Sequence, residues 1–227
     1  MVLAAALGAA LAVAPAFGVE APPPLPITAL APGKAGTRLV LLVTGEAGRS
    51  DFESALGREL AAGGSGVLIL DAKAYLGTPK TPSRMAAESE EAIRRYAKVW
   101  NRPRLVIVGY SRGADVSPFI ANRLSADLKD RLDAVVLLGP AGRASFELTL
   151  REAVTNRPRV TDLPVRPELE RLRGTRLLCA YGRQEPSPFC SRVDSTLMHV
   201  VVRAGGHKLA LADGKPIAQL IVERLGQ

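Results

Sequence analysis

Residues 106–124 read VIVGYSRGADVSPFIANRL, and this stretch decides the fold. An apolar run ends at Gly109, Ser111 follows two residues later, and Gly113 comes just before an amphipathic pattern. This order is typical of a strand that passes directly into a helix. The turn either holds Ser111 as a nucleophile or is an ordinary loop that contains a small residue. In the first case the serine backbone is strained, and side chains in place of the glycines would collide with the adjacent strand and helix.

Short apolar runs alternate with helical patterns on both sides of this stretch. Val, Leu and Ile fill the runs without polar alternation, which indicates strands covered on both faces. Six strands are predicted in this way, at 38–44, 66–71, 104–110, 133–140, 175–182 and 197–206. The last helical pattern lies at about 215–225, and an Arg- and Pro-rich segment, 140–174, is the expected place for a cap or substrate loop. The alternation predicts an α/β fold with a mainly parallel, doubly wound sheet of about six strands and helices on both faces.

Length and charge narrow the functional classes. The chain has 227 residues, which fits one domain of ordinary size. Its formal net charge of +8 is compatible with an anionic partner such as a phospholipid surface or an acidic substrate, but a solvated basic surface is the default interpretation. The arginines are scattered, and the sequence lacks zinc-finger spacing, a basic arm and an RNA-binding aromatic motif, so we predict no nucleic-acid partner.

The N-terminal segment is apolar and rich in small residues. Residues 1–21 contain no Lys or Arg, and the apolar stretch before Pro15 is short for a membrane span. We interpret 1–21 as a signal peptide for export, with an uncleaved N-terminal membrane anchor as the alternative. Residues 22–36 are predicted to form a proline-rich linker, and residues 37–227 the folded domain.

Three residue types associated with catalysis follow predicted strands. In open α/β sheets, active sites gather beyond the carboxyl ends of the strands. Those ends supply Ser111 after the third strand, Glu185 after the fifth and His207 after the sixth. A serine, an acid and a histidine in this order are the triad order of α/β-hydrolases, which makes the α/β-hydrolase fold the specific prediction.

The general base is chosen by elimination, because the chain has two histidines. His199 lies inside a predicted strand and is expected to be a core or edge residue. His207 follows two glycines in the loop beyond the last strand, where it can reach a serine hydroxyl. We therefore favour His207 as the base.

The acid is less sharply defined. Glu185 lies three residues past the fifth strand, and Asp194 is the rival nine residues further on. Asp115 lies one helical turn after Ser111, where it is poorly placed to orient His207. We favour Glu185 and keep Asp194 open.

The two cysteines of the chain, Cys179 and Cys190, flank the loop that contains Glu185. In an exported protein such a pair suggests a disulfide, and the alternative is two unrelated thiols. A bridge here would restrict the acid loop and help to keep Glu185 in place.

An oxyanion hole is also expected. In this fold one donor is the backbone N–H after the nucleophile, which is that of Arg112, and the second comes from the loop after the first strand, near Glu46 or Ala47. We predict neither a metal site nor a cofactor.

Five segments together resemble the bacterial virulence protein VirJ family: GYSRGADVSPFIANRL (109–124), VVLLGP (135–140), FELTL (146–150), LLCAYGRQE (177–185) and GGHK (205–208). The resemblance covers about residues 36–225. It implies a periplasmic α/β-hydrolase associated with type IV secretion, with secretion-system proteins as possible partners. The implied activity is hydrolysis of lysyl-phosphatidylglycerol, an aminoacylated phospholipid, to lysine and phosphatidylglycerol.

Carried over to this chain, the resemblance assigns the serine, histidine and acid to Ser111, His207 and Glu185. It matches Asp115 to the acidic position of the GAD segment, where we weigh contact with the substrate's ammonium group against a structural hydrogen bond within the turn. Two departures lie at the pocket mouth. Arg112 replaces a bulky apolar residue, and the first loop reads TGEAGRSDF where the family has a pattern like SGDGGW. Both departures concern the substrate more than the mechanism.

Two other functions compete with this one. The first is a general periplasmic carboxylesterase or acyl hydrolase that uses the same triad. The second is a non-enzymatic, secretion-associated virulence protein that keeps the fold without using the triad.

Overall fold

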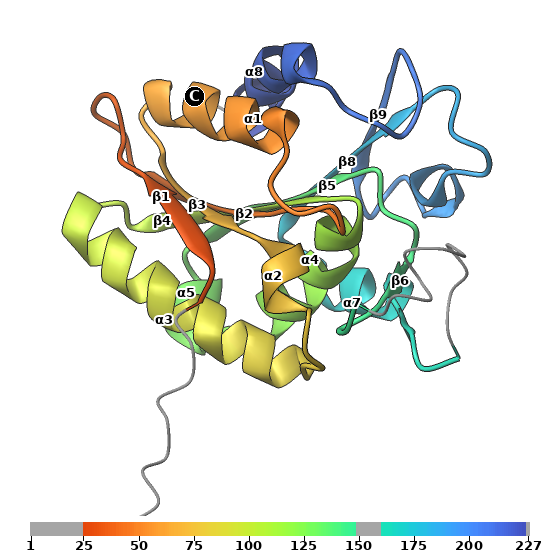
Figure 1. Cartoon of the computed structure of the whole chain (residues 1–227), viewed down its shortest axis with the longest axis horizontal. Helices are drawn as coiled ribbons and strands as arrows, with labels where there is room; N and C mark the ends of the chain where they lie inside the picture. Colours follow the sequence, from red (N-terminus) through yellow and green to blue (C-terminus); the bar gives the residue numbers. More distant parts are fainter. Residues whose placement is uncertain (1–24, 149–159, 226–227) are drawn as a thin grey trace, which may run out of the picture.

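The structure is a computed structural model that describes residues 25–148 and 160–225, so the predicted signal peptide lies outside the described residues. A seven-stranded sheet in the order β1-β3-β2-β4-β5-β8-β9 forms its centre (Figure 1). The strands are β1 (Ile27–Leu30), β2 (Arg38–Val43), β3 (Gly66–Leu70), β4 (Arg104–Tyr110), β5 (Leu132–Leu138), β8 (Arg176–Gly182) and β9 (His199–Arg203). All strands of this sheet except β1 pair in parallel, and these six lie where the sequence predicts them.

The seventh strand corrects the sequence prediction. β1 lies in the segment 22–36 that we interpreted as a linker, and it pairs antiparallel with β3 at the edge of the sheet. Its four residues are only half-buried. They follow a run of prolines, which is typical of a linker in sequence. Edge strands tolerate nearby proline because one side of their backbone needs no partner.

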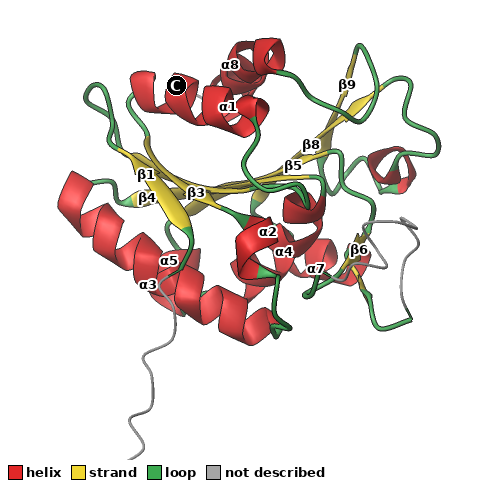
Figure 2. Ribbon diagram, in the orientation of Figure 1, coloured by secondary structure: helices red, strands yellow, loops and turns green. Residues whose placement is uncertain are grey.

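Helices cover both faces of the sheet (Figure 2). The helices are α1 (Asp51–Ala62), α2 (Ala72–Tyr75), α3 (Pro82–Trp100), α4 (Arg112–Arg123), α5 (Ala126–Lys129), α7 (Arg166–Arg171) and α8 (Gly214–Leu225), with 3-10 turns η1 (Phe189–Arg192) and η2 (Leu211–Asp213). α1 and α8 pack on one face, and α3, α4, α5 and α7 lie on the other. Side chains of β2 alternate between the two cores, with Leu39 and Leu41 on the α3 face and Val40 and Leu42 on the α1 face. This two-sided burial explains the unbroken apolar runs of the sequence.

The described part of segment 140–174 packs against the core with buried residues that include Phe146, Val165 and Leu169. β6 (Arg143–Ala144) pairs antiparallel with β7 (Leu163–Pro164), and α7 follows. FELTL (146–150) extends beyond the described residues at its last two positions. Within the described ranges, no helix combines the length and apolarity that crossing a bilayer requires.

The predicted disulfide is confirmed. It joins Cys179 on β8 to Cys190 on η1, with their Cα atoms 6.2 Å apart. Both cysteines are buried, and the chain between them carries Glu185. The bridge therefore closes the acid loop at its base.

Replacing both Cys179 and Cys190 with alanine is expected to lower the free energy of unfolding by about 3 kcal/mol, because the bridge restricts an eleven-residue separation in the unfolded chain. Urea denaturation with and without a reductant measures this change. Reductant should destabilise the native protein and leave the double variant unaffected. An unchanged unfolding midpoint for the reduced native protein would contradict the prediction.

Candidate active site

Ser111 occupies a tight turn between β4 and α4. Its backbone angles are φ 51° and ψ −118°, in a region that costs a non-glycine residue about 1–3 kcal/mol. A Cβ atom at Gly109 would overlap the backbone of Gly113, and one at Gly113 would overlap the carbonyl of Val43. The prediction that side chains at these glycines would collide with the neighbouring strand and helix is confirmed.

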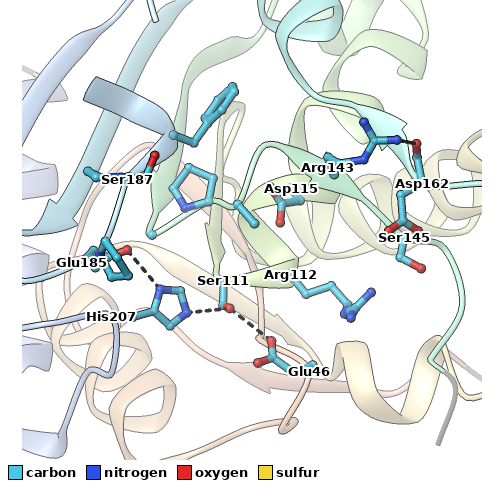
Figure 3. Close-up of a pocket in the computed structure, with 16 residues that line it drawn as sticks. Glu46, Ser111, Arg112, Asp115, Arg143, Ser145, Asp162, Glu185, Ser187 and His207 are labelled. Atoms are coloured by element: carbon cyan, nitrogen blue, oxygen red, sulfur yellow. Dashed lines mark hydrogen bonds and ion pairs between the residues drawn. The ribbon is translucent and has the colours of Figure 1, made fainter. Parts of the chain in front are cut away.

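The structure brings Ser111, His207 and Glu185 together (Figure 3). Ser111 Oγ lies 2.9 Å from His207 Nε2, and His207 Nδ1 lies 3.2 Å from Glu185 Oε2. The other oxygen of Glu185 accepts a hydrogen bond of 2.6 Å from the backbone N–H of Gly182. The Glu185 side chain is only 9% exposed, so water competes little for its contacts. Each member of this chain of contacts comes from the carboxyl end of a different strand, as the sequence predicts.

The two rival residues lie outside this arrangement. Asp194 is exposed and accepts hydrogen bonds of 2.8 Å from the backbone and side chain of Thr196. These bonds hold the pKa of Asp194 below its usual range. His199 opens the edge strand β9 and is exposed. Neither residue is placed to serve Ser111.

Tyr110 positions the histidine loop, a role that the sequence reasoning missed. Its ring stacks on the His207 imidazole, with ring centres 5.8 Å apart. Its hydroxyl donates to the carbonyl of His207 and accepts from the N–H of Leu209, both at 3.3 Å. The only sequence signal was an aromatic residue directly before the serine.

Gly139 leaves room for the same imidazole. Its φ is +60°, and a Cβ atom there would lie 3.0 Å from His207 Nδ1. A side chain at this position would therefore crowd the imidazole atom that contacts Glu185 as well as strain the backbone.

The loop after β2 contributes a side chain where the sequence predicted only a backbone donor. Ser111 Oγ donates a 3.1 Å hydrogen bond to Glu46 Oε2. Ala47 is exposed and does not line the cavity beside Ser111. Arg112 is the first residue of α4, and the first N–H groups of a helix have no acceptor within it. The oxyanion roles of the Arg112 and Glu46 or Ala47 N–H groups stay predictions.

A cavity of about 500 Å³ opens beside Ser111. Its acidic lining residues are Glu46, Asp115, Asp162 and Glu185, and its basic ones include Arg112 and Arg143. Both signs of charge are thus present, which suits a ligand that carries an ammonium and an anionic group. Among the described residues, no group of three or more His, Cys, Asp or Glu side chains is arranged to hold a metal ion.

The model of the family described as "Bacterial virulence protein (VirJ)" matches residues 37–227. The chain belongs to the VirJ family. No curated protein sequence matches it.

Solved structures similar to this VirJ-family chain share its fold at low identity. Est1E from Butyrivibrio proteoclasticus is 15% identical, with 88% of this chain and 93% of that chain covered and a TM-score of 0.62. A probable hydrolytic enzyme from Pseudomonas aeruginosa is 16% identical, with 88% and 89% covered and a TM-score of 0.59. The esterase domain of a Rhodothermus marinus protein is 12% identical, with 85% and 88% covered and a TM-score of 0.59. These likenesses establish the α/β-hydrolase fold.

Asp115 of this VirJ-family protein is buried at the cavity wall, with 3% of its surface exposed. Its Oδ1 accepts a 2.8 Å hydrogen bond from the N–H of Gly142, and Ala141 donates a second backbone bond. Burial raises the pKa of Asp115 to about 8, against the opposing effects of these N–H groups and of Arg112. Asp115 thus ties α4 to the loop after β5. The observed role of Asp115 is structural, as in the alternative of a hydrogen bond within the turn at Ser111, but its bonds reach beyond that turn. Contact of Asp115 with a substrate ammonium group stays a prediction.

The raised pKa predicts a pH-dependent stability. Between about pH 4 and pH 8 the folded state holds a proton on Asp115 that the unfolded state has lost, so this group makes stability fall as pH rises. The slope is at most about 1.4 kcal/mol per pH unit. Asp115→Asn removes the titration, so the native protein should lose stability relative to this variant from pH 5 to pH 8 in urea denaturation. An equal difference at both pH values would show that the pKa of Asp115 is not raised in the folded state.

Proposed function

We propose that this protein is a serine ester hydrolase and that its substrate is the aminoacyl ester of lysyl-phosphatidylglycerol. The observation that carries the proposal is the continuous contact from Ser111 Oγ through both imidazole nitrogens of His207 to Glu185. A hydroxyl, a base and an orienting acid at these distances are the parts of a nucleophilic acyl-transfer site.

In the first half-reaction, Ser111 Oγ attacks the ester carbonyl carbon and its proton moves to His207 Nε2. Glu185 stabilises the resulting imidazolium. Backbone N–H groups, with that of Arg112 as the first candidate, stabilise the negative charge on the former carbonyl oxygen. The ester C–O bond then breaks, and the proton on Nε2 passes to the departing glycerol oxygen, which releases phosphatidylglycerol.

In the second half-reaction, water attacks the lysyl-serine ester while His207 accepts its proton. The bond to Oγ breaks, the proton returns to Oγ, and lysine leaves. The products are one lysine and one phosphatidylglycerol per water consumed.

The charges of the cavity support this substrate. Lysyl-phosphatidylglycerol carries ammonium groups on the acyl side of the ester and a phosphate on the glycerol side. Glu46 contacts Ser111, whereas Arg112 and Arg143 line the same cavity (Figure 3). We assign the arginines to the phosphate side, which gives Arg112 a use where the family has an apolar residue. The net charge of +8 favours contact with an anionic bilayer, and the apolar segment 1–21 supports export to the periplasm.

The test is incubation of the purified chain with vesicles that contain lysyl- or alanyl-phosphatidylglycerol, followed by mass spectrometry of lipids and free amino acids. We expect release of lysine and phosphatidylglycerol by the native protein and none above background by Ser111→Ala. Hydrolysis of simple acyl esters without lysine release would indicate a general carboxylesterase. Absence of any ester hydrolysis would overturn the enzymatic proposal.

A further inference from the structure

The hydroxyl of Ser111 lies between two acceptors. Glu46 Oε2 is 3.1 Å from Oγ on one side, and His207 Nε2 is 2.9 Å from it on the other (Figure 3). A serine hydroxyl has one proton to donate. In the free protein the two groups therefore compete for it, and attack on an ester requires that the imidazole receives it.

The carboxylate of Glu46 has a second effect. It lies 3.1 Å from Oγ. When Oγ attacks a carbonyl carbon, negative charge forms on the oxygen bonded to that carbon, and a carboxylate so close to Oγ disfavours this charge. A hydrolase for uncharged esters would be hindered by this carboxylate on both counts. A substrate that carries a positive charge next to its carbonyl group reverses both effects.

Hydrogen bonds hold the backbone of the loop that carries Glu46. Gly48 N–H donates to Gly45 O at 3.1 Å and closes the turn, and the N–H of Gly45 donates to Glu53 Oε1 at 3.3 Å. Glu53 is buried on α1, with 1% of its surface exposed. The turn is thus anchored to the body of the domain, and the Glu46 carboxylate points from it to the nucleophile.

We propose that Glu46 binds the α-ammonium group of an α-aminoacyl ester and so determines specificity for this class of substrate. The inference rests on the proposed ester hydrolase function and names the group of the substrate that is recognised. The α-nitrogen is two bonds from the carbonyl carbon that Oγ attacks, so it lies close to the carboxylate that contacts Oγ. Its N–H groups donate to Glu46, the proton of Ser111 turns to His207, and the ammonium charge offsets that of Glu46.

The experiment compares two lipids that differ only in the α-ammonium: lysyl-phosphatidylglycerol, and phosphatidylglycerol esterified with 6-aminohexanoate on the same hydroxyl. The native protein, Glu46→Gln and Glu59→Gln are assayed on both in mixed micelles. Glu59 is exposed on α1 and does not line the cavity, so its variant controls for the loss of one negative charge.

The quantity compared is kcat/KM for the lysyl lipid divided by kcat/KM for the 6-aminohexanoyl lipid. We expect this ratio to fall about tenfold or more in Glu46→Gln, because one charge-assisted hydrogen bond is lost. Glu59→Gln should keep the native ratio. A ratio that Glu46→Gln leaves unchanged, including an equal loss on both lipids, overturns the assignment while the hydrolase function stands. Failure of the native protein to hydrolyse either lipid overturns the proposed function, and the assignment with it.

Discussion

Replacing Ser111 with alanine is expected to reduce lysine release from lysyl-phosphatidylglycerol by roughly 10⁴-fold or more. The variant loses the hydroxyl that forms the acyl-enzyme in the proposed mechanism, while His207 and Glu185 keep their contact with each other. Alanine takes the same backbone region with the same strain, so the unfolding midpoint should stay close to that of the native protein. The measurements are product release by mass spectrometry and urea denaturation of the same preparation.

The matched control is Ser195→Ala. Ser195 is exposed and does not line the cavity beside Ser111. We expect full activity from this variant. Substantial hydrolysis by a folded Ser111→Ala protein would show that Ser111 is not the nucleophile.

The sequence contains enough local information to predict the sheet and the tight turn at Ser111. Runs such as RLVIVGY (104–110) are apolar at every position that faces either layer of helices, so their pattern predicts a strand buried on both faces. Gly109 and Gly113 mark a backbone approach that excludes side chains, which makes the turn around Ser111 recognisable. The order of the chain then places Glu185 and His207 at the same sheet edge.

What could not be predicted depends on contacts between distant segments. β1 is a strand because β3 offers it backbone partners, and the four residues themselves show no alternation. The contact of the Glu46 side chain with Ser111 joins residues 65 positions apart, and Tyr110 meets the carbonyl of His207 across 97 positions. Glu185 and Asp194 differ in whether the loop turns them toward His207, which spacing alone does not determine.

Replacing Glu185 with glutamine is expected to lower kcat by about 10²–10⁴-fold, and this variant separates the two candidate acids. Asp194→Asn is the matched control, because it makes the same chemical change on an exposed carboxylate of the same loop region. We expect Asp194→Asn to keep native activity. A large loss in Asp194→Asn together with retention in Glu185→Gln would assign the acid to Asp194 and contradict the geometry around His207.

The size of the expected loss follows from a count of acceptors. Glu185 accepts twice in the structure, from the N–H of Gly182 with Oε1 and from His207 Nδ1 with Oε2. Glutamine has one amide oxygen, so it can satisfy only one of these donors. If the oxygen faces Gly182, the amide N–H groups face Nδ1 and favour the tautomer with its proton on Nε2, which cannot accept the proton of Ser111. If the oxygen faces His207, the buried N–H of Gly182 loses its acceptor, and the imidazolium formed during attack has no negative charge beside it. Either orientation removes a contribution that catalysis requires, and the loss should appear in kcat because it arises after the substrate has bound.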